Sequence, residues 1–375
     1  MKIGYIVHDL HDAAVRRRHR AMTKAGAAVV LAGFVRAANS DTGIIDGGEL
    51  VLGQTEDAKL AKRAISVAGA MLSNGALRRH LADCDVIVAR NLESLAIARQ
   101  VVGARPLVYE CLDIHRLLLG NGPAHRLVQA AESALLRRVD LILTSSPAFI
   151  REYFAHRPYR GEVFLLENRL EIGPFGGDPG ISMIPALPPA GCWTIGWFGM
   201  LRCRRSLDEL LRLAREHPDT LDVLIAGKPS PAELPDLPAR VSEHPNVTYA
   251  GPYRPPDLRD LYARCHFSWC IDWFEEGLNS AWLLPNRLYE STAFGAVPIA
   301  LESVETGRWL ADRNCGLVVE NTARLGEFLH DLKPERYMAL RGSVEALERS
   351  AVIADAQEAK NLMNTFAQLQ AGGDQ

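Results

Sequence analysis

The sequence has little that would mark a secreted, disulfide-bonded or membrane-spanning protein. Its seven cysteines are scattered and include no CxxC pair, which argues against both a disulfide framework and a zinc site. No apolar run reaches the roughly 18 residues that a transmembrane helix needs. The opening MKIGYIVHDL has no charged leader before its apolar residues, so we expect no signal peptide. These absences predict a cytoplasmic protein and leave peripheral attachment to a membrane open.

The sequence also lacks a strong excess of either charge. Its formal net charge is −3, with 42 Lys and Arg against 45 Asp and Glu. Residues 1–175 carry 23 basic and 18 acidic side chains, whereas the remainder carries 19 and 27. A nucleic-acid-binding protein usually shows a concentrated basic surface, so we expect no nucleic-acid partner. The modest basic excess of the first half leaves an anionic ligand open there.

The apolar pattern predicts two α/β domains in this chain of 375 residues. In the first half, short apolar runs separated by helical-length segments are typical of a doubly wound parallel sheet. Expected strands cover residues 2–7, 28–33, 85–89, 106–109 and 141–144, and expected helices cover residues 13–25, 92–102 and 124–138. Residues 171–190 concentrate Gly and Pro, so we place the first domain at residues 1–175 and a linker at residues 176–190.

The same alternation restarts after the linker and predicts a second doubly wound domain at residues 191–350. Expected strands cover residues 193–198, 222–226, 247–249, 267–271, 297–301 and 317–319, and expected helices cover residues 206–216, 232–244, 256–263 and 286–294. Residues 351–375 contain a long amphipathic segment that we expect to cross back onto the first domain. Ligands of such sheets bind at the carboxyl ends of strands, so the cleft between the domains is the expected site.

The loop after the first strand of the second domain, GWFGMLRCRRSLDELL, is a candidate phosphate site. Gly199 allows a tight turn before a helix that Ser206 could cap. Arg202, Arg204 and Arg205 cluster ahead of that helix. Helix N-termini attract phosphate, and guanidinium groups add bidentate hydrogen bonds to it. A solvated basic turn is the alternative interpretation.

Two later strand ends carry further polar candidates. Gly227 and Lys228 follow a strand in the segment LIAGKPS, where a second phosphate contact and a merely exposed lysine are equally good interpretations. Asn286, Arg287 and Glu290 are spaced to lie near one face of a helix. Glu290 could accept two hydrogen bonds from the hydroxyls of a ribose, and Arg287 could meet a phosphate. The alternative is a surface ion pair between Arg287 and Glu290, although the flanking residues are apolar.

The stretch PNRLYESTAFGAVPIA resembles the nucleotide-sugar signature of GT-B glycosyltransferases, in particular the bacterial group 1, or family 4-like, enzymes. The opening MKIGYIVHDLHDAAVRRRHRAM is similar to that of succinoglycan-type exopolysaccharide biosynthesis glycosyltransferases. The resemblance covers most of the chain and implies a GT-B fold, with two Rossmann-like domains that face a cleft. It implies that the first domain binds the acceptor and the second binds the nucleotide sugar. It also implies that Glu290 binds the donor ribose and that the loop of residues 199–205 faces the diphosphate.

Two positions depart from the pattern of this family. Met200 stands where the family usually has an arginine, although Arg205 occupies the position of its lysine and Arg202 could compensate. Trp282 stands where the family often has an earlier glutamate, although the two glutamates just upstream could align with an insertion. The sequence therefore predicts the donor site more firmly at Glu290 than at the other family positions.

In the first domain, the segment ECLDIH follows a strand and is similar to an acceptor loop of the same family. An acceptor hydroxyl loses its proton as it attacks the anomeric carbon, and a carboxylate or an imidazole can take that proton. If the reaction inverts configuration, Asp113 is the expected base, with His115 and the loop of Asp9 and His11 behind it. If the reaction retains configuration, Asp113 instead positions the sugar. The alternatives are a helix cap for Asp113 and a polar lining role for His115.

The helix sequence VRRRHR supplies much of the positive charge of the first domain. A solvated helix face is the common explanation for Arg16, Arg17 and Arg20. The sharper interpretation is contact with anionic lipid or with the pyrophosphate of a lipid-linked acceptor. Asp83 and Asp85 form a DxD sequence, but they stand at the start of a strand, so we expect no metal site there. We expect no cofactor besides the nucleotide diphosphate sugar, which is a co-substrate.

The residues and the resemblance together predict a glycosyltransferase of exopolysaccharide biosynthesis. The expected donor is a UDP-sugar, UDP-glucose above all, and the expected acceptor is a lipid-linked oligosaccharide, with the inner-membrane surface as a further partner. Three alternatives stay open. They are a glucuronosyl- or mannosyltransferase of capsule or lipopolysaccharide assembly, a non-catalytic nucleotide-sugar-binding protein of the same fold, and a GT-B-fold epimerase.

Overall fold

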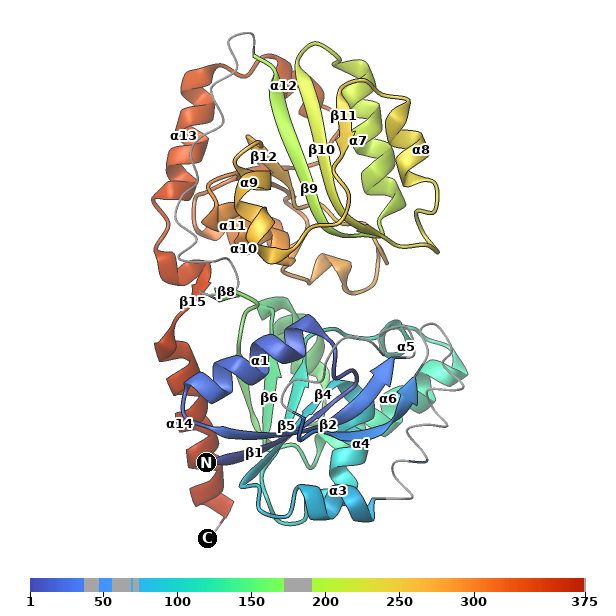
Figure 1. Ribbon diagram of the computed structural model, residues 1–375, viewed down its shortest axis with the longest axis vertical. Helices are drawn as coiled ribbons and strands as arrows, with labels where there is room; N and C mark the ends of the chain where they lie inside the picture. Colours follow the sequence, from blue (N-terminus) through green and yellow to red (C-terminus); the bar gives the residue numbers. More distant parts are fainter. Residues whose placement is uncertain (37–46, 56–68, 70–73, 172–190, 374–375) are drawn as a thin grey trace. The chain divides into compact units, whose positions relative to one another are not determined.

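The computed structural model describes residues 1–36, 47–55, 69, 74–171 and 191–373, and it divides the chain into two compact units (Figure 1). Unit 1 comprises Met1–Glu167 and Asp355–Gln375, and unit 2 comprises Asn168–Ala354. The predicted linker at residues 176–190 lies outside the described residues. The units divide near residues 167 and 354 rather than 175 and 350, because β8 (Leu170–Glu171) pairs with β15 (Ile353–Ala354) inside unit 2.

A parallel sheet forms the centre of unit 1, with the strand order β3-β2-β1-β4-β5-β6-β7 among the described residues. The strands are β1 (Lys2–Val7), β2 (Ala28–Arg36), β3 (Leu50–Thr55), β4 (Val86–Arg90), β5 (Leu107–Cys111), β6 (Leu141–Thr144) and β7 (Glu162–Leu165). β4, β5 and β6 are buried throughout, as their continuous apolar runs predict. The order reverses between β1 and β4, and ligands of such sheets usually bind at this switch point.

Helices cover both faces of the sheet of unit 1. They are α1 (Ala13–Lys24), α3 (Gly75–His80), α4 (Asn91–Val101), α5 (Arg116–Leu119), α6 (Pro123–Leu136), α14 (Ala356–Gly373), the π-helical turn η2 (Phe149–Tyr153) and the 3-10 turn η3 (Phe154–His156). α14 lies beside α1 (Figure 1), where Leu362 and Phe366 join the core of the central strands. The predicted return of the C-terminal helix to the first domain is therefore confirmed.

Unit 2 contains a second parallel sheet, with the order β11-β10-β9-β12-β13-β14 among the described residues. Its strands are β9 (Trp193–Leu201), β10 (Leu221–Pro229), β11 (Val247–Tyr249), β12 (Phe267–Trp269), β13 (Val297–Leu301) and β14 (Leu317–Val319). The chain reverses the order of the strands between β9 and β12, which makes the carboxyl end of β9 the switch point of this sheet. Both sheets are parallel and alternate with helices, so the predicted α/β class is confirmed.

Helices also cover both faces of the sheet of unit 2. They are α7 (Arg204–Glu216), α8 (Leu237–Ser242), α9 (Leu258–Tyr262), α10 (Asn286–Ala293), α11 (Glu305–Asp312), α12 (Leu325–His330) and α13 (Pro334–Glu345), with the 3-10 turns η4 (Pro255–Asp257), η5 (Asn279–Ala281) and η6 (Arg349–Ala351). One core joins Leu207 and Leu210 of α7 to Trp193 and Ile195 of β9. A separate core on the other face joins α9 to Phe198.

Two local predictions in unit 2 are wrong, each for a reason that lies in the chain. α7 begins at Arg204 and is capped by Cys203, whose Sγ accepts a hydrogen bond from the Ser206 amide. Ser206 therefore lies inside the first turn, where its hydroxyl donates to the carbonyl of Ile271. The helix predicted at residues 232–244 is shortened to α8, because Pro235 cannot continue a helix.

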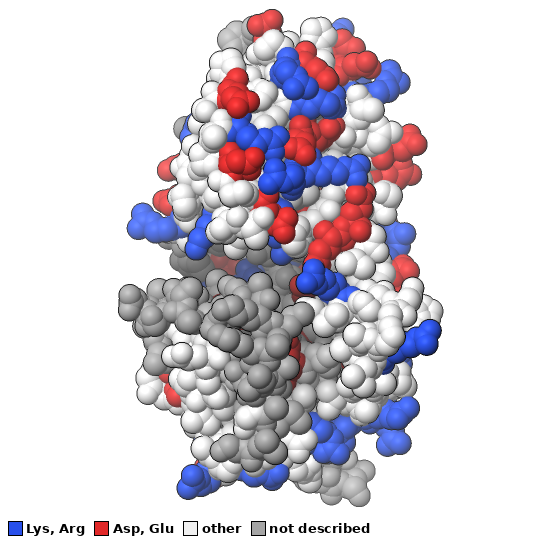
Figure 2. Space-filling view, turned by 90° about the vertical axis from the view of Figure 1, so that its right-hand side faces the viewer, with Lys and Arg blue, Asp and Glu red and all other residues white. Residues whose placement is uncertain are grey.

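The two units also differ in the charge that they present. On the face shown in Figure 2, basic and acidic side chains are interspersed in unit 2, at the top, whereas basic side chains dominate the visible charge of unit 1. None of the helices in the described ranges is both long enough and apolar enough to cross a membrane.

Candidate functional site

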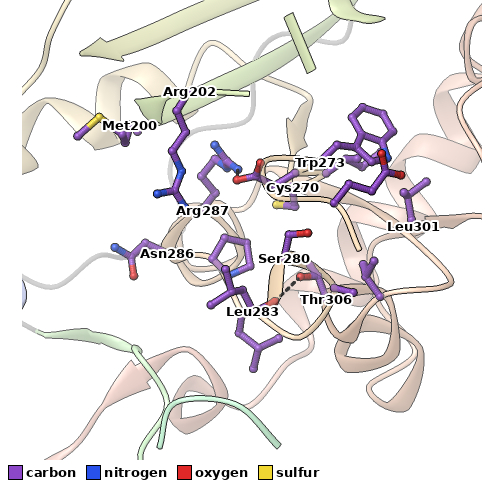
Figure 3. A pocket seen from close by; sticks show the side chains of 18 of the residues that line it. Met200, Arg202, Cys270, Trp273, Ser280, Leu283, Asn286, Arg287, Leu301 and Thr306 are labelled. Atoms are coloured by element: carbon purple, nitrogen blue, oxygen red, sulfur yellow. Dashed lines mark hydrogen bonds and ion pairs between the residues drawn. The ribbon is translucent and has the colours of Figure 1, made fainter. Parts of the chain in front are cut away.

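A pocket of about 570 Å³ lies in unit 2 at the switch point of its sheet (Figure 3). Its wall is formed by the end of β9, the segment after β12, the start of α10 and the turn after β13. Of the predicted donor-binding residues, Gly199, Arg202, Asn286, Arg287 and Glu290 line it. The structure thus brings together two parts of the chain that are about 90 residues apart in sequence and that the sequence analysis had linked only through a resemblance.

Gly199 lines this pocket, and Gly227 on the neighbouring strand packs closely against it. Gly199 has a φ of +119°, a conformation that few other residues adopt, and it pairs in register with Gly227 of β10. Gly227 has a φ of +140°, and a Cβ atom there would lie 1.8 Å from the carbonyl oxygen of Gly199. Gly227 therefore allows the close approach of β10 to β9. Neither Gly227 nor the exposed Lys228 lines the pocket.

Arg287 is almost completely buried at the base of the pocket, with 7% of its surface exposed. Its Nη2 lies 3.3 Å from Oδ2 of Asp272, and its Nη1 donates to the carbonyl of Phe198 at 3.5 Å. The ion pair of Arg287 is thus made with Asp272, a residue that the sequence analysis did not single out. Its Nε is buried and has no hydrogen-bond partner among the described residues, so one donor of this guanidinium is unused.

Glu290 lies on α10, half-buried beside an aromatic wall. The hydroxyl of Tyr262 donates to its Oε2 at 3.4 Å, and Tyr262 stacks on Phe294 with the ring centroids 5.7 Å apart. Burial and then the nearby Glu290 carboxylate raise the pKa of Tyr253 and that of Tyr262 above the usual value. Both phenols stay protonated at neutral pH, and Glu290 lines the pocket.

The two arginines before and within α7 take different positions. Arg202 lines the pocket with its guanidinium 4.4 Å from the centre of the Phe274 ring. In Figure 3 its guanidinium and that of Arg287 lie on the same side of the pocket, with Asn286 close by. Arg205 does not line the pocket, because it stacks on Trp273 at 4.4 Å and pairs with Glu276. Of these two arginines, Arg202 is therefore the one that contributes positive charge to the pocket.

The segment between β12 and α10 supplies most of the pocket residues that the sequence analysis missed. Asp272, Trp273, Glu276 and Ser280 all line the pocket, as does Thr306 after β13. The sequence CIDWFEEGLNSAWLLP has neither a helical nor a strand period, so no pattern indicated which side chains would share a face. Its two adjacent glutamates were the one available signal.

In unit 1, the predicted acceptor residues lie in two loops. Asp113 is exposed, whereas His115 is the N-cap of α5 and its Nδ1 accepts a hydrogen bond from the Leu117 amide at 3.2 Å. The helix-cap role therefore belongs to His115 and not to Asp113. This hydrogen bond occupies Nδ1 of the His115 imidazole.

The other predicted loop of unit 1 is mostly buried. Asp9 is 3% exposed, and its Oδ1 accepts a hydrogen bond from the amide of His11 at 3.0 Å. Nδ1 of His11 lies 3.8 Å from the same oxygen. The next residue in the loop, Asp12, caps α1 and pairs with His8. Asp9 and His11 thus shape the loop between β1 and α1 and present little surface to a ligand.

The basic face predicted on α1 is only partly exposed. Arg20 is exposed, but Arg16 and Arg17 are half-buried. Arg18 points into unit 1, where its Nε donates to Oε1 of Glu110 at 2.8 Å. Some arginines of α1 therefore stabilise unit 1 and others face the solvent. A run of arginines in the sequence does not distinguish the two kinds.

Arg18 belongs to a buried network that the sequence analysis missed. The other members of the network are Tyr5 of β1, Arg90 of β4 and Glu110 of β5, which hydrogen-bond to one another near the carboxyl ends of these strands, at the switch point. Glu110 is fully buried, and Nη1 of Arg90 lies 3.3 Å from its Oε2. Burial alone would raise the pKa of Glu110, but the charges of Arg90 and Arg18 outweigh it and hold that pKa below its usual value.

The DxD sequence lies at the opposite end of these strands, just before β4 begins. Asp85 accepts a hydrogen bond from the Lys2 amide at 2.7 Å, and Asp83 pairs with the Lys2 side chain at 3.6 Å. Both carboxylates therefore hold the first strand in place. Across the described part of the chain, no group of three or more His, Cys, Asp or Glu side chains is arranged to hold a metal ion.

Comparison with known proteins gives one close sequence relative and many structural ones. The chain is 42% identical to succinoglycan biosynthesis protein ExoL of Rhizobium meliloti (strain 1021), over 98% of this chain and 94% of that protein. No family model matches the sequence.

Among solved structures, sucrose-phosphate synthase from Thermosynechococcus elongatus superposes with a TM-score of 0.73, at 16% identity, over 99% of this chain and all of that one. HepE of Anabaena in complex with UDP gives a TM-score of 0.71, at 15% identity, over 98% of this chain and all of that one. At these identities the likeness shows the fold, and the predicted GT-B fold is confirmed.

Proposed function

Because this chain belongs to the GT-B glycosyltransferases, in the family of succinoglycan biosynthesis protein ExoL, we propose that it transfers a hexose from a UDP-sugar to a lipid-linked oligosaccharide in exopolysaccharide biosynthesis. The proposed donor is UDP-glucose. Structures of HepE, which has the same fold, contain UDP and UDP-glucose, and this supports a uridine nucleotide here.

The observation that carries this proposal is the convergence of Glu290, Arg202 and Arg287 on one pocket of unit 2. A ribose offers two adjacent hydroxyls, and a carboxylate can accept a hydrogen bond from each. A diphosphate offers several anionic oxygens, which guanidinium groups bind strongly. The volume of about 570 Å³ falls in the range of ordinary small-molecule sites.

The charge of the pocket supports a neutral sugar. Three carboxylates, those of Asp272, Glu276 and Glu290, line it together with Arg202 and Arg287. Because Asp272 already neutralises Arg287, a uronic acid would bring a further carboxylate into a pocket with little positive charge to spare beyond that needed for the diphosphate. A neutral hexose such as glucose avoids this repulsion, which favours it over the glucuronosyl alternative.

In the proposed reaction, the acceptor hydroxyl oxygen forms a bond to the anomeric carbon while the bond from that carbon to the diphosphate oxygen breaks. The leaving UDP carries the electron pair, and Arg202 stabilises the charge that develops on it. If the reaction inverts configuration, the carboxylate of Asp113 takes the hydroxyl proton. If it retains configuration, the proton goes to the leaving phosphate and Asp113 positions the acceptor.

A matched pair of substitutions tests the diphosphate assignment. We expect Arg202→Ala to weaken the binding of UDP roughly 10- to 100-fold, since it removes a charge-assisted hydrogen bond from the pocket. Arg205→Ala makes the same change at an arginine that does not line the pocket, and it should change the affinity for UDP much less. Isothermal titration calorimetry with UDP measures both. Equal losses in the two variants would contradict the assignment of Arg202.

The catalytic assignment is tested by Asp113→Asn. We expect the rate of sugar transfer to fall about 10²- to 10⁴-fold if Asp113 is the base, while UDP binds with unchanged affinity because Asp113 lies in unit 1. Asp83→Asn is the matched control, since Asp83 is exposed in the same unit and holds only the Lys2 side chain. Transfer of labelled glucose into lipid-linked material is the assay, and full activity of Asp113→Asn would remove Asp113 from the mechanism.

A further inference from the structure

One residue that lines the pocket of unit 2, Asn168, belongs to the segment where the chain enters that unit. Every other described residue of the lining lies within residues 198–306. Asn168 is the first residue of unit 2 and directly follows Glu167, at which the first part of unit 1 ends. Its side chain is half-buried and makes no hydrogen bond to any residue in the described ranges. The carboxamide of Asn168 is therefore available to a ligand of the pocket.

The residues that follow Asn168 are fixed to unit 2 by other contacts. Nη1 of Arg169 donates a hydrogen bond to the carbonyl of Ser350 at 2.9 Å. The amide of Leu170, the first residue of β8, donates to the carbonyl of Val352 at 2.9 Å. The side chain of Leu170 is 3% exposed and joins the core that includes α10, and β8 contacts that helix. The backbone therefore holds Asn168 in place while its side chain stays unused, which is the arrangement of a preorganised binding group.

A second carboxamide without a partner lies at the start of α10. Asn286 is exposed, lines the same pocket and makes no hydrogen bond to another residue in the part of the chain that the structure describes. In Figure 3 it lies on the same side of the pocket as the guanidinium groups of Arg202 and Arg287. The pocket thus combines charged groups that suit a diphosphate with neutral amides that suit another part of the ligand.

The order of the polar groups along α10 matches the order of the parts of a UDP-hexose. Glu290, proposed to hold the ribose, follows Asn286 by four residues, which is a rise of about 6 Å along the helix. Arg287, proposed to lie near the diphosphate, stands between them in sequence. The hexose is joined to the outer phosphate, so it continues past the diphosphate toward the start of α10.

The chemistry of a carboxamide also fits a hexose better than it fits the rest of the diphosphate sugar. Its oxygen accepts a hydrogen bond and its nitrogen donates two, whereas a sugar hydroxyl can both donate and accept. Phosphate oxygens only accept, and guanidinium groups bind them more strongly than amides do. With the ribose assigned to Glu290 and the phosphates to the arginines, the hydroxyls of the hexose are the remaining partners for the carboxamides.

We infer that Asn168, together with Asn286, binds the hydroxyls of the neutral hexose of the donor and is a specificity-determining residue of the enzyme. The inference rests on the proposed function, because it requires a UDP-hexose in this pocket, and it deepens that function by naming the residue that recognises the sugar. It also gives the segment between β7 and β8 a role in binding, since Asn168 lies where the chain passes from one unit to the other.

Calorimetric titration of the full chain with UDP and with UDP-glucose tests the inference. Asn168→Ala should bind UDP as the wild type does, because the missing group faces the hexose, and this result also shows that unit 2 is folded. Its affinity for UDP-glucose should fall about 3- to 10-fold, as expected for the loss of one or two neutral hydrogen bonds. The matched control is Asn321→Ala, which replaces an exposed asparagine of the same unit that does not line the pocket. It should bind both ligands as the wild type does.

The two ligands separate this inference from the proposed function. If Asn168→Ala loses affinity for UDP as much as for UDP-glucose, then Asn168 contacts the nucleotide and the inference is wrong. Unchanged affinity for both ligands overturns it as well. If the selective loss of UDP-glucose affinity is found but the wild type transfers no sugar to any acceptor, the inference stands and the proposed transfer fails.

Discussion

Replacing Glu290 with alanine is expected to weaken the binding of UDP by roughly 10- to 150-fold. A hydrogen bond to a charged group contributes about 1.5–3 kcal/mol, and the carboxylate is proposed to hold the ribose through two of them that are partly offset by dehydration. Calorimetric titration of the wild type and of Glu290→Ala with UDP measures the difference. Trp273 lines the same pocket, so its fluorescence offers a second readout of binding.

The control for this substitution is Glu327→Ala, which removes an exposed glutamate from another helix of the same unit. It should bind UDP as the wild type does. The fold of Glu290→Ala is checked by tryptophan fluorescence during urea unfolding, because all six tryptophans lie in unit 2. If the folded variant binds UDP with wild-type affinity, then Glu290 does not hold the donor and the pocket has another ligand.

Replacing Glu110 with glutamine is expected to destabilise unit 1 by about 3–5 kcal/mol. The substitution keeps the shape of the side chain but leaves the buried Arg90 and the partly buried Arg18 without their shared negative partner. Since unit 1 contains no tryptophan, hydrogen exchange of the peptides that cover β1, β4 and β5 is the appropriate measurement. Tryptophan fluorescence should meanwhile show unchanged unfolding of unit 2.

The same network predicts a dependence on pH. The pKa of Glu110 in the folded chain lies below its usual value of 4.5, so its ionised form stabilises the fold at neutral pH. This contribution is complete above about pH 4.5 and is lost as the pH falls through the lowered pKa. The difference between the wild type and Glu110→Gln should therefore shrink in acid. Glu162 is an exposed glutamate on β7 of the same sheet. The Glu162→Gln variant should show the hydrogen-exchange protection of the wild type at every pH.

The parts of the fold that the sequence predicted well are those set by local patterns. The strands at residues 141–144, 247–249, 297–301 and 317–319 have the predicted bounds. Those at 141–144 and 297–301 are buried throughout, and buried parallel strands read as short continuous apolar runs. The return of α14 to unit 1 was also predicted, since the last helix is amphipathic and long enough to cover an exposed sheet face.

The parts that the sequence could not predict depend on pairing through space. Arg287 lies 15 positions from Asp272, and Arg18 lies 92 positions from Glu110, so no helical or strand period links either pair. The arginines of α1 look alike in the sequence, although Arg18 pairs with Glu110 inside unit 1 and Arg20 is exposed. Likewise, the exposure of Leu127 depends on which side of α6 the buried Glu132 occupies, and a sequence pattern alone places a leucine inside.

The donor site shows the same division. The order of Asn286, Arg287 and Glu290 on one helix indicated a shared site, and all three line the pocket. The separate positions of Arg202 and Arg205 could not be predicted, because they depend on Trp273 and Glu276 in a segment without any period. A sequence can thus indicate which segments of the chain contact a ligand. It indicates less well which of several similar side chains makes the contact.

The proposed function of this chain is to move a hexose from a UDP-sugar to a lipid-linked oligosaccharide. The most direct test incubates the purified full chain with UDP-glucose labelled in the sugar and with lipid-linked oligosaccharide, and then measures label in the organic phase. We expect enzyme-dependent label in the lipid-linked product together with release of UDP. The same assay is repeated with each labelled UDP-hexose. If the label always stays in the donor or appears only as free hexose, the proposed function is wrong.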